Sequence, residues 1–429
     1  MDKTINERKE QTKPQPARQS NLDAIVSYFE SGIKSVHAPH ALGIELEHIV
    51  LNKDMTPVGY SDDHGVAWLL HELSTAYPRI TQDDRGDILG VSRPSEAITI
   101  EPAAQLELSA GPFASLTTAK DCFDAFEDNV NTILAPYDKL IVPVGYNPTA
   151  KARTLELIPK RRYQFMNMYL SERDTDGPCM MRGSASTQIS IDYTSVADCL
   201  RKIRIAFALV PLLSLICDNT PIYEGQVRSH HMMRTSMWNH VDPDRCGLVH
   251  GALNPDFTLR KYAEYVLDTP AILVPCTQNS WCYDDRTFGE IYADRTMTQA
   301  EVEHALSMFF TDVRLKTYIE IRPADSMPIP YVIAYAALIK GLFYSPANLD
   351  ALEALFADVD SNAFVAAKDA LMQDAYNASV YGRNASELCD TIISLAEKGL
   401  AQDELPYLAP LANLVKQRQT LAETSEFNK

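Results

Sequence analysis

Four stretches of the chain alternate acidic or polar residues with apolar residues. They read GIELEH (43–48), ITIEPAAQLELSAG (98–111), SASTQISIDY (184–193) and KTYIEIRPAD (316–325). Successive side chains of a β-strand point to opposite faces, so each stretch predicts a strand with one polar and one apolar face. The longest, 98–111, is predicted as a single strand.

If these strands belong to one sheet, their acidic side chains share a surface. The six carboxylates are Glu45, Glu47, Glu101, Glu107, Asp192 and Glu320. Two like charges about 4 Å apart repel by roughly 4 kcal/mol near a protein surface. The nearby cations Lys316 and Arg322 are too few to neutralise six carboxylates, so the surface needs bound protons or metal ions. Oxygen ligands without Cys or His favour Mg²⁺, with Mn²⁺ as a substitute. The alternative is four strands in separate places, each facing water.

Length and composition allow one large domain or two ordinary ones, with ample apolar residues for a core. The chain has 429 residues, is 46% hydrophobic and carries a net charge of −18. This charge argues against a nucleic-acid or anionic-membrane partner, although a metal-bound nucleotide stays compatible with it. No run approaches the roughly 18 apolar residues of a membrane span. Residues 1–20 lack an apolar signal segment and are predicted to be a disordered leader.

The eight cysteines are scattered, without CxxC or zinc-binding spacing. Several, such as Cys199 and Cys217, lie in apolar helical patterns and are predicted to be buried free thiols. This usage indicates a reducing cytoplasm, with a regulatory disulfide as the alternative.

Helical periodicity separates the predicted strands and then dominates the end of the chain. Predicted helices cover 21–34, 66–77, 115–134, 196–217, 259–267 and 298–310, and the pattern is helical from about 331. The irregular segment 227–247, rich in His, Met, Arg and Trp, is predicted to be a binding loop. We therefore expect the α+β class, with residues 21–429 as a single catalytic domain.

Basic residues are concentrated between residues 151 and 173, and most of them precede a group of aromatic residues in the same segment. It is either a solvated turn before a helix or a site for carboxylate or phosphate, to which the planar arginine fork is suited. No GxxxxGK[ST], GxGxxG or GxSxG sequence occurs, so neither a P-loop, a dinucleotide fold nor a nucleophile elbow is indicated.

With these stretches in place, the sequence resembles the glutamate–cysteine ligases of the plant and proteobacterial type. The likeness covers about residues 40–345 and rests on motifs that follow in the family's order. They are ITIEPAAQLELSAGP, PKRRYQFMNMYL, the MM…TQISIDY segment, MRTSMWNHVDPDRCGLV, YAEYVLDTP and RLKTYIEIRPAD.

The resemblance implies a fold like the glutamine synthetase catalytic domain: a curved, mostly antiparallel sheet that forms an open funnel with helices outside. It implies that ATP phosphorylates the γ-carboxylate of L-glutamate and that the amine of L-cysteine attacks the acyl phosphate. Mg²⁺ or Mn²⁺ would bridge the carboxylates and the triphosphate. The protein would act as a monomer or homodimer.

The resemblance also assigns roles by position. The metal ligands would be Glu45, Glu47, Glu101, Glu107 and Glu320. Glu101, Glu320 and Arg322 would be catalytic, and Arg322 would stabilise the transferred phosphoryl group. Nucleotide binding would involve Gln188, Ser190 and Arg245, and substrate binding Arg162, Tyr163, Met181, Trp238, Tyr262 and Tyr265.

Two departures from the family pattern concern the acceptor. The family's EPGGQ is EPAAQ here, so either the backbone avoids positive φ at Ala103 and Ala104 or the substrate approaches less closely. The arginine that follows the family's Met pair is displaced, since Arg182 directly follows Met181 and Gly183 takes its place. A γ-glutamyl ligase for another amino acid or amine is therefore the alternative, and a non-catalytic nucleotide-sensing relative is a third reading.

Overall fold

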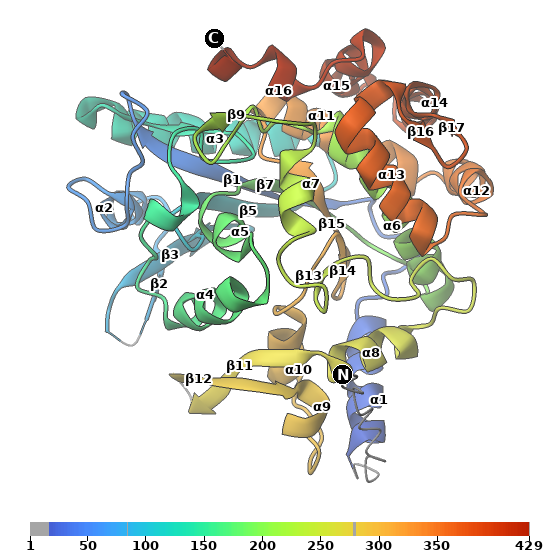
Figure 1. Ribbon diagram of the computed structural model, residues 1–429, viewed down its shortest axis with the longest axis horizontal. Helices are drawn as coiled ribbons and strands as arrows, with labels where there is room; N and C mark the ends of the chain where they lie inside the picture. The colour runs from blue at the N-terminus through green and yellow to red at the C-terminus, as the bar shows by residue number, and fades with distance from the viewer. Residues whose placement is uncertain (1–16, 84, 278–279, 429) are drawn as a thin grey trace, which may run out of the picture.

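A nine-stranded sheet forms the centre of the part of the molecule that the computed structural model describes, residues 17–83, 85–277 and 280–428 (Figure 1). Every strand pair in it is antiparallel, as predicted. Across the sheet the strands are β14 (Val313–Leu315), β15 (Ile319–Asp325), β7 (Ser186–Ile191), β1 (Leu42–Asn52), β5 (Leu106–Phe113), β4 (Glu96–Ile100), β3 (Ile88–Arg93) and β2 (Arg79–Gln82), and β6 (Lys139–Val142) pairs with the end of β1.

The apolar face of the sheet packs against three long helices. They are α3 (Leu116–Leu134), α6 (Val196–Ile216) and α11 (Ile329–Phe343). The alternating residues Ile44, Leu46, Leu108 and Ile189 are at most 1% exposed and belong to the main core. Burial of each of these side chains stabilises the fold by about 1.5–3 kcal/mol. It also fixes the register of the strands, because a slip of one residue would turn the acidic side chains toward the core.

The stretch 98–111 is a hairpin, so its prediction as one strand was wrong. Strands β4 and β5 are joined by a turn in which Glu101 N donates to Gln105 O at 2.9 Å and Ala104 N to Glu101 O at 2.9 Å. Ala104 has a φ of 67°, so the backbone does not avoid positive φ at this position. A left-handed conformation costs an L-residue about 1–2 kcal/mol. The turn places Glu101 at the tip of the hairpin.

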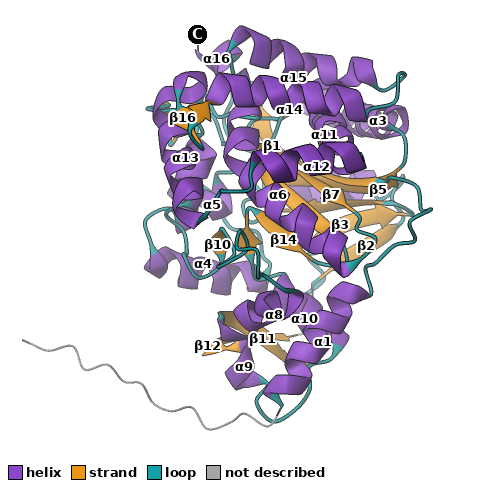
Figure 2. Cartoon of the chain, turned by 90° about the vertical axis from the view of Figure 1, so that its right-hand side faces the viewer, coloured by secondary structure: helices purple, strands orange, loops and turns teal. Residues whose placement is uncertain are grey.

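A smaller group of elements, which we call the lower lobe, lies below the sheet in Figures 1 and 2. It consists of α1 (Arg18–Glu30), α8 (Leu259–Asp268), α9 (Phe288–Ile291), α10 (Gln299–Leu306) and the hairpin β11 (Pro270–Thr277)–β12 (Ser280–Thr287). The buried Asn21 donates to Tyr292 O at 2.8 Å and accepts from Met297 N at 2.7 Å, which ties α1 to the lobe. Residues 18–20 of the predicted leader are thus helical, and residues 1–16 lie outside the described residues.

The chain after residue 331 is helical apart from one short hairpin, β16 (Ser379–Val380)–β17 (Arg383–Asn384). Helices α11, α14 and α15 lie together above the sheet in both views. Gly341 and Gly399 allow α11 and α14 to touch, because a Cβ on Gly399 would lie 2.0 Å from Gly341 O. The helices that follow α11 are α12 (Pro346–Leu355), α13 (Ser361–Asp374), α14 (Ala385–Gly399), α15 (Leu405–Gln417) and α16 (Leu421–Thr424).

The remaining elements include three helices in front of the sheet's polar face, namely α4 (Arg161–Arg173), α5 (Gly177–Arg182) and α7 (Met233–Trp238). The segment 227–247, predicted to be an irregular loop, therefore contains a short helix. The other elements are α2 (Val66–Leu73), the strand pairs β8 (Ile222–Tyr223)–β9 (Gln226–Val227) and β10 (Cys246–Gly247)–β13 (Phe310–Thr311), and the 3-10 turns η1 (Ala135–Tyr137), η2 (Ala152–Thr154), η3 (Ala375–Asn377) and η4 (Glu426–Asn428).

Six cysteines are free thiols, and five of these, including Cys199 and Cys217, are buried as predicted. Cys276 and Cys282 form a disulfide within the β11–β12 hairpin, which their scattered spacing did not indicate. In the described ranges no single helix has the length and hydropathy to cross a membrane, and only α11 and α12, bent by 87°, meet that criterion as a pair.

Candidate active site

The polar side chains of the sheet form rows across its strands. Glu47 on β1 lies opposite Glu107 on β5, and Glu45 lies opposite Gln188 on β7. Glu320 on β15 lies opposite Ser190 on β7. The prediction that the four polar-faced stretches join in one sheet is therefore confirmed. Asp192 lies apart from the glutamates. It follows the end of β7, where Lys34 and Lys202 are its neighbouring charges.

A cavity of about 460 Å³, which we call the polar cavity, lies between this face and α4, α5 and α7. It holds four glutamates, Glu45, Glu47, Glu101 and Glu107, which we call the glutamate cluster. Its cations are Lys160, Arg162, Arg234, Arg314, Lys316 and Arg322, and its apolar lining includes Met166, Met180, Met181, Trp238, Trp281 and Phe310. The cavity can thus bind carboxylates, cations and an apolar group at once.

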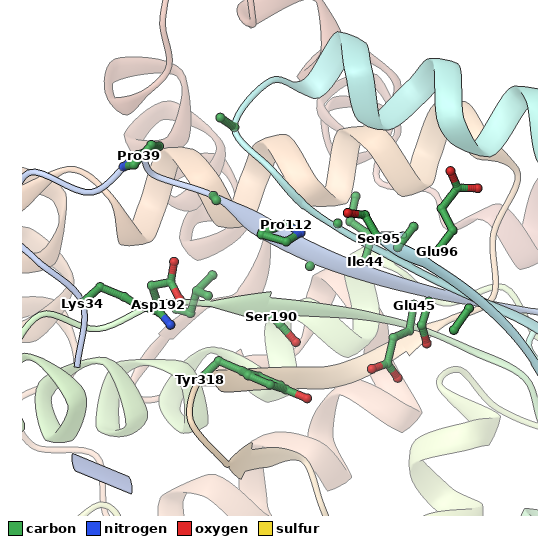
Figure 3. Close-up of a pocket in the computed structure, with 18 of the residues that line it drawn as sticks. Lys34, Pro39, Ile44, Glu45, Ser95, Glu96, Pro112, Ser190, Asp192 and Tyr318 are labelled. Atoms are coloured by element: carbon green, nitrogen blue, oxygen red, sulfur yellow. The ribbon is translucent and has the colours of Figure 1, made fainter. Parts of the chain in front are cut away.

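A second cavity of about 810 Å³, the apolar cavity, continues along the same strands (Figure 3). Ile44, Ser190, Pro112 and Tyr318 line it, and Figure 3 shows Lys34 and Asp192 at the end away from Glu45. Glu45 lines both cavities. Glu45 is therefore the member of the glutamate cluster that lies between the two cavities.

Burial and mutual repulsion disfavour ionisation of the glutamate cluster. Burial, with the charges of Glu320 and Glu107, raises the pKa of Glu45 to about 8. Burial, with Glu101 and Glu107, raises the pKa of Glu47 to about 8. Burial also raises the pKa of Glu101, against the opposing effect of Lys160, and that of Glu107. The cluster accepts full negative charge only with additional positive charge nearby.

Hydrogen bonds hold three of these carboxylates in place. Glu47 accepts from Ser186 N at 2.7 Å and from Ser186 Oγ at 2.9 Å. Glu107 accepts from Thr99 Oγ1 at 2.8 Å and from Ser109 Oγ at 3.0 Å. Glu101 accepts from the Tyr163 hydroxyl at 3.4 Å. Each carboxylate oxygen has a second lone pair, so these bonds leave room for a cation.

The donor set fits a hard divalent cation in its chemistry, since it consists of carboxylate oxygens whose charges need compensation. In the described part of the chain, no three His, Cys, Asp or Glu side chains are placed to hold one metal ion together. Mg²⁺ is usually bound through one or two carboxylates, with water and substrate phosphates completing its coordination.

Glu320 behaves differently, because three cations surround it. It is fully buried and accepts from Arg314 Nε at 2.6 Å, Arg322 Nη1 at 2.8 Å and Lys316 Nζ at 3.2 Å. Although burial opposes ionisation, Arg314, Lys316 and Arg322 hold the pKa of Glu320 well below its usual value. Its carboxylate lies beneath these side chains and does not line the polar cavity, so its role as a metal ligand stays a prediction from the sequence.

Three further cations in the polar cavity have no carboxylate within ion-pair distance among the described residues. Arg162 donates to Ser307 O at 2.9 Å, and Lys160 stacks over the Tyr163 ring at 4.5 Å. Arg234 is 5% exposed and donates to Arg322 O at 3.3 Å, while its buried Nε has no protein partner. These cations are available for substrate carboxylates.

Sequence reasoning missed several of these residues. Lys160 belongs to the predicted basic segment but is not among the predicted site residues, and Arg234 lies in a motif whose predicted site residues are only Trp238 and Arg245. Trp281 comes from the lower-lobe hairpin, which no predicted strand covered. The unexpected number of Arg and Lys in an acidic chain was the available signal for the first two.

Three predicted ligand-binding residues, Arg245, Tyr262 and Tyr265, line neither cavity. Arg245 is fully buried and donates to Asp242, Met308 O, Tyr169 and Pro270 O, so its donors are used within the protein. Tyr262 is 1% exposed, and its hydroxyl accepts from Leu315 N at 3.1 Å. Tyr265 packs its ring between Tyr262 and Phe309. All three stabilise the junction between the lower lobe and the sheet.

The displaced arginine also lies outside the polar cavity. Arg182 donates to Leu155 O at 2.9 Å and to Asn167 Oδ1 at 2.7 Å. Gly183 lies against the Tyr146 ring, and a Cβ there would come within 2.2 Å of it. Gln188, Arg162, Tyr163, Met181, Trp238 and Arg322 line the polar cavity, and Ser190 lines the apolar cavity.

Comparisons with known proteins identify the family of the chain. The model of glutamate-cysteine ligase family 2 matches residues 41–424. The chloroplastic glutamate–cysteine ligase of Arabidopsis thaliana is 26% identical over 344 residues, which are 78% of this chain and 65% of that protein. The Medicago truncatula enzyme is 23% identical over 410 residues, or 93% of this chain and 80% of that protein.

Two solved structures share the fold. The glutamate–cysteine ligase of Francisella tularensis in complex with AMP has a TM-score of 0.56 at 12% identity, over 91% of this chain and 85% of that chain. The bifunctional glutathione synthetase of Pasteurella multocida has a TM-score of 0.51 at 12% identity, over 97% of this chain and 53% of that chain.

Proposed function

The chain belongs to glutamate-cysteine ligase family 2, and from this premise we propose that it is an ATP-dependent ligase. It joins the γ-carboxylate of L-glutamate to the amine of L-cysteine through γ-glutamyl phosphate, the first step of glutathione biosynthesis. The observation that carries the proposal is that two cavities share Glu45, one of four glutamates that need additional positive charge. We also assign the sheet to the open funnel of the glutamine synthetase class.

The nucleotide occupies the apolar cavity in this proposal. Its lining of Ile44, Pro39, Pro112 and Tyr318 suits a flat base, and Ser190 offers a hydroxyl. The Francisella ligase with the same fold was solved with AMP, which supports a nucleotide on this sheet. The triphosphate then points past Glu45 into the polar cavity.

Magnesium would be held by Glu45, Glu47, Glu101 and Glu107, with Mn²⁺ as a substitute. When bound, the metal neutralises phosphate charge and orients the transferred group. We leave Glu320 out of this set, because its two oxygens already accept from three cations.

The polar cavity binds the amino acids. Lys160, Arg162 and Arg234 have no carboxylate partner among the described side chains and are suited to hold α-carboxylates. Met181, Trp238 and Trp281 surround the remaining space, and thioether and aromatic groups pack well against a thiol. The cavity thus accommodates one amino acid donor and one amino acid acceptor.

The reaction has two balanced steps. A γ-carboxylate oxygen of glutamate attacks the γ-phosphorus of ATP, the bond to the β-phosphate oxygen breaks, and ADP leaves with that electron pair. The neutral amine of the acceptor then attacks the acyl carbon, the bond from that carbon to the phosphate oxygen breaks, and the nitrogen loses one proton to the departing phosphate or to water. Arg322 at the cavity wall stabilises charge on the transferred group.

An amine panel tests the proposal. Purified protein with ATP, glutamate and Mg²⁺ is given cysteine, alanine, 2-aminobutyrate or methylamine, and ADP and the γ-glutamyl product are measured. We expect cysteine to give the highest kcat/KM. Equal turnover with alanine or methylamine would favour the alternative, a γ-glutamyl ligase for another acceptor, for which the displaced Arg182 is the supporting observation. A cytoplasmic location and a monomeric or homodimeric state stay predictions from the sequence.

A further inference from the structure

The three cations around Glu320 form a defined unit, which we call the Glu320 cluster. Arg314 lies opposite Glu320 in the β14–β15 register, Lys316 belongs to the turn that joins these strands, and Arg322 is two residues further along β15. Alternation places all of these side chains on the polar face of the sheet.

Additional hydrogen bonds fix the cationic groups. Arg314 Nη1 donates to Phe309 O at 3.0 Å, Lys316 Nζ donates to the Tyr318 hydroxyl at 3.3 Å, and Arg322 donates to Gln188. With these bonds and the shared Glu320 carboxylate, the three groups are preorganised and lose little freedom when a ligand binds.

One buried carboxylate does not require three buried cations. A single Arg–Glu pair satisfies Glu320, and each further buried charge carries a desolvation cost of several kcal/mol unless it serves another partner. The Glu320 cluster therefore has an excess of positive charge on a sheet face that otherwise carries glutamates. This excess suits an anion with about two negative charges, such as a phosphoryl group.

The Glu320 cluster also lies next to both cavities. Arg314, Lys316 and Arg322 line the polar cavity, while Tyr318 in the same turn lines the apolar cavity. Glu320 pairs across the sheet with Ser190, which lines the apolar cavity, and Glu45 lines both. A phosphoryl group passing from one cavity to the other has the glutamate cluster on one side and the Glu320 cluster on the other.

We propose that Arg314 and Lys316 act with Arg322 as direct contacts to the transferred phosphoryl group, and that Glu320 is the positioning residue that holds all three. This inference rests on the proposed function and extends its catalytic set by two residues. As the bond to the β-phosphate breaks, charge spreads over the phosphoryl oxygens and the leaving oxygen. Fixed N–H donors stabilise that charge without reorganisation.

The test separates phosphoryl transfer from acceptor chemistry. Wild-type protein is incubated with Mg²⁺, ATP, glutamate and hydroxylamine, which captures γ-glutamyl phosphate as a hydroxamate without any amino acid acceptor. We expect Lys316→Met to lower hydroxamate formation about 100-fold and to weaken binding of Mg²⁺ with β,γ-imido-ATP about tenfold in calorimetry. Lys316→Arg restores most of both, and Arg314→Lys gives an intermediate loss.

Two controls decide the outcome. Lys53→Met removes an exposed lysine that is 63% accessible and pairs with Asp138, and it should match wild type in every assay. If Lys316→Met and Arg314→Lys both keep nucleotide affinity and hydroxamate formation within twofold of wild type, the inference is overturned.

Failure of the proposed function would look different. Wild type would then form no hydroxamate, while the calorimetric comparison between wild type and Lys316→Met would still report whether the cluster contacts phosphate. A loss of affinity in that comparison supports the inference even without turnover, and equal affinities overturn it.

Discussion

The two sides of the site use the same side chain in opposite ways. In the glutamate cluster, Glu45 and Glu47 lie among like charges, and their pKa values rise to about 8. In the Glu320 cluster, a fully buried glutamate has three cationic partners, and its pKa falls well below the usual value. The neighbours, and not burial alone, decide whether a buried glutamate is ionised.

The two clusters therefore contribute to stability with opposite dependence on pH. A carboxyl group whose folded pKa lies above its unfolded value of 4.5 stabilises the fold at low pH, and this contribution is lost as pH rises from about 4.5 to 8. Glu320, with a lowered pKa, contributes stability above pH 4.5 that is lost on acidification. Of the two clusters, only the glutamate cluster needs positive charge from a ligand or metal ion to become fully ionised.

The largest expected effect on kcat comes from removing one carboxylate charge from the glutamate cluster or from the Glu320 cluster. Glu101→Gln and Glu320→Gln keep the side-chain shape, and we expect each to lower kcat for γ-glutamyl transfer by about 10³-fold, because charge stabilisation in a buried site dominates such reactions. Circular dichroism should show an intact fold. The exposed Glu397→Gln is the matched control. Near-normal turnover in both variants would refute the assignment of the site.

The Mg²⁺ dependence of activity also distinguishes the two clusters. Glu107→Gln should raise the Mg²⁺ concentration needed for half-maximal activity about tenfold, since it removes a proposed ligand. Glu320→Gln should leave that concentration within twofold of wild type, because Glu320 positions cations. A large shift with Glu320→Gln would return Glu320 to the metal ligands predicted from the sequence.

A smaller effect is expected at Arg234, one of the three cations of the polar cavity that have no carboxylate partner among the described residues. Arg234→Lys keeps the charge but loses the planar fork, so we expect KM for glutamate or cysteine to rise about tenfold with less than a threefold change in kcat. The affinity for Mg²⁺–nucleotide should stay within twofold of wild type, because Arg234 is assigned to an amino acid carboxylate and the substitution keeps its charge. A change in nucleotide affinity with unchanged amino acid KM would contradict the division between the two cavities.

Metal removal should change how the melting temperature depends on pH. In EDTA the melting temperature should fall between pH 5.5 and 8.5, because Glu45 and Glu47 must lose protons in the folded state. Mg²⁺ at 100 times its Kd contributes about 2.7 kcal/mol, so a rise of a few degrees is expected at pH 8 and less at pH 6. The double variant Glu45→Gln/Glu47→Gln should show a shallower pH slope. Equal slopes would remove these two glutamates as the cause.

Much of the sheet could be predicted because alternation reports directly on strand faces. Ile44 and Leu46 are core residues, and Glu45 and Glu47 face the cavities, as the pattern requires. The turn after Glu101 could not be predicted, because EPAAQ has no glycine at the position that adopts positive φ. The alternation continues across the hairpin and hides it.

The site was only partly predictable, for a different reason. A motif shows which residue types are near in sequence, but not which of their hydrogen-bond donors are already used. Arg245 and Arg234 lie in one motif, yet Arg245 is satisfied by the protein and Arg234 faces the cavity with an unpartnered nitrogen. Trp281 reaches the cavity from a separate lobe, which only the tertiary structure reveals.

The smallest expected effect tests this distinction at Tyr262, which the motif assigned to the acceptor site and the structure places in the core. Tyr262→Phe removes the acceptor for Leu315 N and should lower the free energy of unfolding by about 1–2 kcal/mol, the cost of a buried unsatisfied donor. KM for cysteine should stay within twofold of wild type, because the hydroxyl reaches neither cavity. Trp281→Ala is the matched comparison, since it removes a cavity-lining side chain and should raise KM for cysteine several-fold. If Tyr262→Phe instead raises KM for cysteine without loss of stability, the acceptor lies on the lower-lobe side of the sheet, and the boundary of the polar cavity must be redrawn there.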